Sequence, residues 1–100
     1  MKVVFTPRAR RRAIAAAKWW RANRLVAPEL FDEELARAKR KLAEKPDIGQ
    51  LYETFGEIVV RRLLLPKTEQ HLYYSVDETA DLVIVYTIWG ARRGKAPELF

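Results

Sequence analysis

The sequence contains no cysteine and only one histidine, His71. Without cysteine the chain forms no disulfide and offers no thiolate ligands, and a single imidazole cannot build a histidine-based metal cluster. We therefore expect no metal and no cofactor, and we expect no small-molecule substrate.

Long apolar runs are also missing. Spanning a bilayer takes about 20 consecutive apolar residues, and no run in this chain approaches that length. The first residues, Met1 to Arg8, lack the apolar stretch of a secretory signal. We expect a cytoplasmic protein without a membrane partner. With 100 residues, of which 49% are hydrophobic, the chain is sized for a single domain covering residues 1–100.

Acidic residues are absent from the first quarter of the chain. Residues 1–25 carry eight Lys or Arg and no Asp or Glu, so the net charge of +6 is concentrated there. A concentrated positive field favours a polyanion or an acidic protein as partner. A basic, solvated face that only keeps the protein soluble is the other interpretation, and both stay open at this point.

The first half of the chain predicts a short strand followed by two helices. Lys2 to Thr6 is rich in β-formers, and Thr6 with Pro7 is typical of a helix start. The helix over residues 8–23 places its alanines and Trp20 on one face and most of its cations elsewhere. A second helix is expected from Pro28 to Pro46, with acids in its first turns and bases in its last.

The second half predicts three strands in a meander. They cover Ile58–Leu64, Gln70–Val76 and Leu82–Trp89, and the turn over residues 66–69 separates the first two. The order is β-α-α-β-β-β, an α+β fold with a mostly antiparallel four-stranded sheet. We expect the helical hairpin on one sheet face and the N-terminal strand beside the doubly apolar strand Leu82–Trp89.

Several segments resemble the RelE/ParE superfamily of toxins from type II toxin–antitoxin systems. They are the opening VVFTPRARRR, the Trp19-Trp20 pair, and Pro28-Glu29-Leu30-Phe31. The meander VVRRLLLPKTEQHLYYSVD, followed by LVIVYTIWGARRG, resembles the ParE-like branch. The resemblance implies a small bacterial protein that inhibits its own cell unless a cognate antitoxin binds it. RelE-like members cut mRNA on the ribosome, whereas ParE-like members poison DNA gyrase and lack the nuclease residues.

The resemblance also names residues for a possible nuclease. Arg92 corresponds to a phosphate-stabilising arginine of the nucleases, and His71 falls where the nucleases place another arginine. Arg62 falls near the position at which the nucleases carry lysines on the preceding strand. The C-terminal tyrosine of the nucleases has no counterpart, because that region reads Lys95-Ala96-Pro97-Glu98. No catalytic residue is therefore favoured. We expect a gyrase inhibitor; the alternatives are a ribosome-dependent mRNA endoribonuclease using Arg62, His71 and Arg92, and an inactive member that only binds its antitoxin.

Two binding surfaces are expected. The surface for the target lies at the basic end of the last strand and comprises Trp89, Arg92, Arg93 and Lys95. The surface for the antitoxin, which the resemblance implies to be a disordered and often acidic segment, lies on the first helix and comprises Arg8, Arg11, Arg12 and Trp19. For Trp89 two interpretations stay open: an exposed anchor of the binding surface, or a residue that closes the core.

Overall fold

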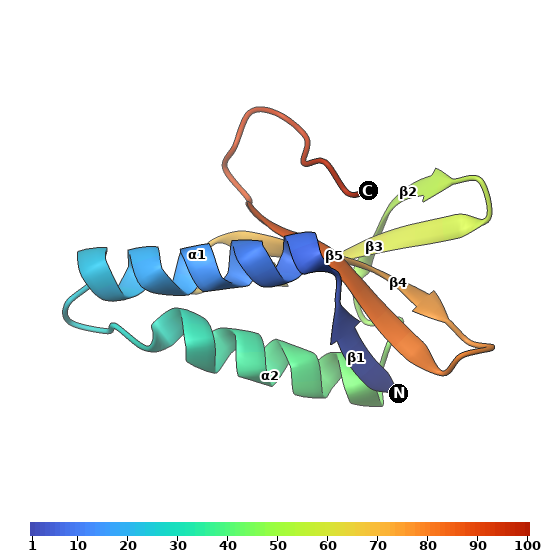
Figure 1. Cartoon of the computed structure of the whole chain (residues 1–100), viewed down its shortest axis with the longest axis horizontal. Coiled ribbons are helices and arrows are strands. Elements are labelled where there is room, and N and C mark those ends of the chain that lie inside the picture. Colours follow the sequence, from blue (N-terminus) through green and yellow to red (C-terminus); the bar gives the residue numbers. More distant parts are fainter.

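The computed structural model describes all residues from 1 to 100 and confirms the α+β class and the order of the predicted elements (Figure 1). No helix is long and apolar enough to cross a membrane. The elements are β1 (Lys2–Phe5), α1 (Pro7–Asn23), α2 (Leu30–Glu44), β2 (Gln50–Phe55), β3 (Ile58–Leu65), β4 (Gln70–Asp77) and β5 (Leu82–Gly90).

The strands form one mixed sheet in the order β1-β5-β4-β3-β2. β1 lies parallel to β5, with Lys2 opposite Leu82 and Phe5 opposite Val85, which confirms the predicted neighbour of the N-terminal strand. All other pairs are antiparallel. Because β1 ends opposite Val85, the second half of β5 has no strand on that side, and α1 runs beside it (Figure 1).

The sheet has five strands, one more than the sequence predicted. The additional strand is β2, with the sequence QLYETF, at the edge of the sheet beside β3. An edge strand with little buried surface needs no apolar face, and Leu51 is indeed 63% exposed. A bulge between Leu51 and Glu53 also breaks the alternation of its side chains. The segment therefore lacks both an apolar face and a regular alternation of side chains, the two signals that identify a strand in a sequence.

Local chemistry sets the start of α1 and the faces of both helices. The Thr6 hydroxyl accepts a hydrogen bond from the Ala9 amide at 3.1 Å, and Pro7 follows it, as predicted. Ala9 and Ala17 are buried on the expected alanine face. α2 begins at Leu30, two residues after the predicted start at Pro28, and it ends at Glu44 before Pro46.

The core lies mainly between the helices and the sheet. Its fully buried side chains include Phe31, Leu42, Leu72 and Tyr74. The Tyr74 hydroxyl accepts a hydrogen bond from the Gly49 amide at 2.8 Å, which joins the segment before β2 to β4.

A smaller apolar cluster covers the sheet face that points away from the helices. It contains Val60, Tyr73, Tyr86, Trp89 and Leu99. Leu99 comes from the C-terminal segment, which leaves β5 and loops back toward the sheet (Figure 1). The C-terminal segment therefore covers part of the sheet face that the helices leave free.

Candidate binding site

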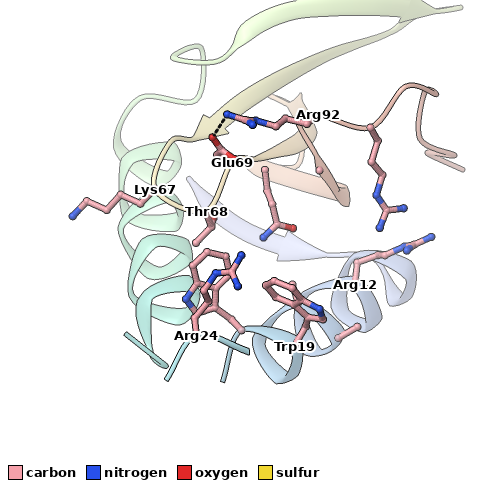
Figure 2. Close-up of a pocket in the computed structure, with 13 residues that line it drawn as sticks. Arg12, Trp19, Arg24, Lys67, Thr68, Glu69 and Arg92 are labelled. Atoms are coloured by element: carbon pink, nitrogen blue, oxygen red, sulfur yellow. Dashed lines mark hydrogen bonds and ion pairs between the residues drawn. The ribbon is translucent and has the colours of Figure 1, made fainter. Parts of the chain in front are cut away.

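A hollow lies between the C-terminal half of α1, the β3–β4 turn and the end of β5. We call it the cationic cavity. Its volume is about 620 Å³, which is within the range of small-molecule sites, about 300–1,000 Å³. Side chains from these separate parts of the chain approach one another around it (Figure 2). It is lined by Arg12, Ala15, Ala16, Trp19, Trp20, Arg24, Lys67, Thr68, Glu69, Gln70, Gly90, Arg92 and Arg93.

The charges around the cationic cavity are strongly unbalanced. Five of its lining residues are Lys or Arg and only Glu69 is acidic. Glu69 is already engaged, because its carboxylate accepts a hydrogen bond from the Arg92 guanidinium at 2.8 Å (Figure 2). The other four cations, Arg12, Arg24, Lys67 and Arg93, form no ion pair. The cavity therefore presents uncompensated positive charge, which favours an anionic ligand.

The ring of Trp89 contacts two of these cations, Arg12 and Arg93. The guanidinium carbon of Arg12 lies 4.9 Å from the centre of this ring, and that of Arg93 lies 4.2 Å from it. The indole is only 8% exposed, and its Nε1 donates a hydrogen bond to the Lys95 carbonyl at 3.0 Å. Trp89 therefore closes the core on this side, and the interpretation as an exposed anchor does not fit. Its role at the cavity is to support Arg12 and Arg93.

The tryptophan pair of α1 divides into one half-buried and one exposed partner. Trp20 is half-buried, and its Nε1 donates a hydrogen bond to the Ala27 carbonyl at 2.9 Å. Trp19 is 49% exposed, and its indole lies at the cavity (Figure 2). The guanidinium carbon of Arg24 lies 4.9 Å from the centre of the Trp19 ring. The cavity thus combines unpaired cations with an accessible aromatic surface.

The wall opposite α1 is held by a buried carboxylate that the sequence did not reveal. Glu34 of α2 accepts hydrogen bonds from the amides of Lys67 at 2.7 Å and Thr68 at 3.0 Å. It also accepts one from the Thr68 hydroxyl at 2.7 Å. These three bonds fix the β3–β4 turn against α2. Glu34 was hidden among the acids at the start of this helix, where a dipole role explains every carboxylate equally well.

The two binding surfaces expected from the sequence meet in this cavity. Arg12 and Trp19 belong to the expected antitoxin surface, and Arg92 and Arg93 to the expected target surface. Lys95 does not line the cavity, but its carbonyl accepts the Trp89 hydrogen bond.

Arg8 and Arg11 lie elsewhere, at a smaller hollow of about 280 Å³ near the start of α1. The C-terminal residues Leu99 and Phe100 also line this hollow. Arg8 is tied to the same segment, since it donates a hydrogen bond to the main-chain oxygen of Phe100 at 3.1 Å and lies 3.7 Å from the Glu98 carboxylate.

Two of the three nuclease candidates lie together on the sheet face away from the helices. Arg62 pairs with Tyr73 across β3 and β4, and His71 follows on the same face, two residues from Tyr73. The Arg62 guanidinium lies 5.3 Å from the centre of the Tyr52 ring. Its Nε is buried and has no hydrogen-bond partner. The third candidate, Arg92, is bound to Glu69 at the cavity instead.

The surroundings of His71 favour its neutral form. Burial lowers the pKa of His71 below its usual value of 6.5, and the positive charge of Arg62 lowers it further. Burial raises the pKa of Tyr52, so this phenol stays protonated at neutral pH. The cluster offers one neutral imidazole and one guanidinium. No three His, Asp or Glu side chains are grouped so that they would hold a metal ion.

The fold and these two sites define a small α+β protein with a cationic, tryptophan-lined cavity and an Arg–His cluster on the sheet face away from the helices, where His71 pairs with Trp89. The sequence matches no protein-family model, and it matches no curated protein.

Proposed function

We propose that this protein is the toxin of a type II toxin–antitoxin system of the ParE-like kind, which inhibits growth by binding DNA gyrase and is neutralised by a cognate antitoxin. The observation that carries the proposal is the cationic cavity, in which residues of both expected binding surfaces meet without forming a reaction centre. The resemblance of the sequence to this superfamily supplies the identity of the partners.

The distribution of the nuclease candidates supports binding over catalysis. Cleavage of RNA through its 2′-hydroxyl needs a base, an acid and a cation for the developing charge, all within reach of one phosphate. Arg62 and His71 lie together, but Arg92 is engaged with Glu69 at the cavity. A C-terminal tyrosine is absent as well. A protein that acts by occupying a surface of gyrase needs none of these groups.

The shared cavity suggests how the antitoxin neutralises the toxin. An acidic antitoxin segment on α1 would contact Arg12 and Trp19, and the same segment would cover Arg92 and Arg93. The antitoxin and the target would then compete for one surface. Neutralisation would follow from occlusion, without a change of the toxin's fold.

Growth arrest after induction in bacteria tests the proposal. We expect DNA synthesis to stop first, together with an SOS response, and we expect the purified protein to inhibit gyrase supercoiling. Replacing Arg12 and Arg93 by Glu should abolish both effects. The matched control replaces Arg40 and Lys41, two exposed cations of α2 outside the cavity, by Glu. Arrest with undisturbed DNA synthesis would contradict gyrase as the target.

A ribosome-dependent endoribonuclease is the second candidate, because Arg62 and His71 share one sheet face and the imidazole is neutral at pH 7. This activity predicts rapid cleavage of translated mRNA within codons. It also predicts that replacing His71 by Gln removes cleavage while the fold persists. If neither DNA synthesis nor mRNA is affected by the folded protein, an inactive member that only binds its antitoxin is the remaining reading.

A further inference from the structure

The cationic cavity gathers positive charge that the fold itself does not use. Arg12 and Arg93 both lie within 5 Å of the Trp89 ring centre, yet neither forms an ion pair. Two like charges near one ring repel each other, and an anion between or beside them would offset this repulsion. Guanidinium groups bind phosphate oxygens in pairs of parallel hydrogen bonds, which makes phosphate a fitting anion.

The aromatic part of the cavity narrows the class of ligand. Trp19 is half exposed; the Arg24 guanidinium lies against its ring and Trp20 lies beside it. Proteins that hold single-stranded nucleic acids combine such an aromatic surface, on which a base stacks, with cations along the backbone. A peptide whose side chains are all carboxylates would satisfy the cations but would offer no planar ring to stack on Trp19.

We propose that the cationic cavity binds a nucleotide of single-stranded nucleic acid, with the base against Trp19 and the phosphates on Arg12 and Arg93. A cavity of about 620 Å³ is large enough for a ligand of this kind. The turn fixed by Glu34 forms its opposite wall, so the cavity exists before the ligand arrives. This inference does not depend on gyrase as the target, because purified protein alone tests it.

Fluorescence anisotropy measures the binding directly. The probe is a labelled oligothymidylate of about ten nucleotides, within the usual site sizes of single-strand binders, titrated with the full chain at low salt. We expect Trp19→Leu to weaken binding about tenfold, the typical effect of losing one stacked base. Arg12→Gln with Arg93→Gln should weaken it about tenfold or more. It should also reduce the slope of log K against log salt by about 1.4, since two phosphate contacts are lost.

A matched variant separates the cavity from general charge. Arg40→Gln with Lys41→Gln removes the same charge from an exposed part of α2 that does not line the cavity. We expect it to change the affinity less than twofold. Equal losses in the two double variants would overturn the proposal, as would unchanged binding by Trp19→Leu. Circular dichroism and thermal melting of each variant exclude unfolding as the cause.

Competition experiments identify the form of the ligand. An unlabelled mononucleotide that displaces the probe at millimolar concentration would show that one nucleotide suffices. Displacement only by an unlabelled oligothymidylate would show that a continuous strand is required. A duplex, or a glutamate-rich peptide, that competes as well as the single strand would contradict stacking on Trp19 and overturn the proposal.

Discussion

Replacing Glu34 by Gln tests whether this buried carboxylate fixes the β3–β4 turn that forms one wall of the cationic cavity. Glu34 is 5% exposed and accepts three hydrogen bonds, from two amides and one hydroxyl. An amide side chain has only one oxygen. In the variant, the NH₂ group would take the place of one carboxylate oxygen and would face a donor that binds to this oxygen in the unsubstituted protein. The turn would lose at least one charged hydrogen bond and leave a polar group without a partner.

The expected cost follows from these bonds. A hydrogen bond to a charged group contributes about 1.5–3 kcal/mol, and a buried unpaired donor costs about 1–3 kcal/mol. Thr68 is buried, whereas Lys67 is exposed, so water can partly replace the hydrogen bond that its amide loses. We therefore expect Glu34→Gln to lower the free energy of unfolding by about 2–4 kcal/mol. For a domain of this size that lowers the melting temperature by roughly 10–25 °C.

Urea and thermal denaturation followed by circular dichroism measure the effect. The matched control is Glu33→Gln, since Glu33 occupies the preceding position of the same helix, is exposed, and makes no side-chain hydrogen bond. We expect the control to change the free energy of unfolding by less than about 0.5 kcal/mol, as surface substitutions usually do. If both variants melt at the same temperature, Glu34 does not hold the turn, and the cavity wall needs another explanation.

Three further substitutions test other parts of the structure. Gly49→Ala should destabilise the fold by about 1–3 kcal/mol, because an added Cβ would lie 2.6 Å from the hydroxyl of a fully buried tyrosine. The control is Gly94→Ala, where nothing lies within 4 Å of the added Cβ, and it should leave the melting temperature nearly unchanged. Equal melting temperatures of the two variants would refute the close packing of Gly49 against this tyrosine. The lowered pKa of His71 means that the unfolded chain takes up a proton more readily, so stability should fall as the pH drops below 6.5 toward the lower folded pKa. His71→Gln should remove this loss in urea melts between pH 7 and 5.5, and an unchanged pH slope would contradict it. Arg11→Glu with Arg12→Glu should slow association with the antitoxin more than it lowers stability; stopped-flow association rates at low salt that match the unsubstituted chain would argue against the α1 surface.

Features encoded by neighbouring residues were predictable from the sequence. The start of α1 rests on Thr6 and Pro7, and its buried face rests on alanines spaced three and four apart. The strands β3, β4 and β5 were found because their apolar content is high, and the neighbour of β1 followed from the two apolar faces of β5. Each signal is local, since it depends on residues within one or two turns or strands.

The edge strand β2 and the position of the C-terminal segment were not predictable in the same way. β2 exposes most of its residues and carries a bulge, so its pairing with β3 is the only reason that it is a strand. The C-terminal segment has no regular structure, and Leu99 is buried only because the segment returns to the second sheet face.

The candidate site shows the same division between local and long-range determinants. The sequence by itself determined that the positive charge is concentrated near α1 and that Arg92 and Arg93 follow the last strand. Only the tertiary structure decided that these two groups face each other across one cavity, because β1 ends early and leaves half of β5 for α1 to cover. It also decided that Trp89 is buried beneath Arg12 and Arg93. Contacts between residues far apart in the chain depend on how the elements pack, and no spacing along the sequence encodes them.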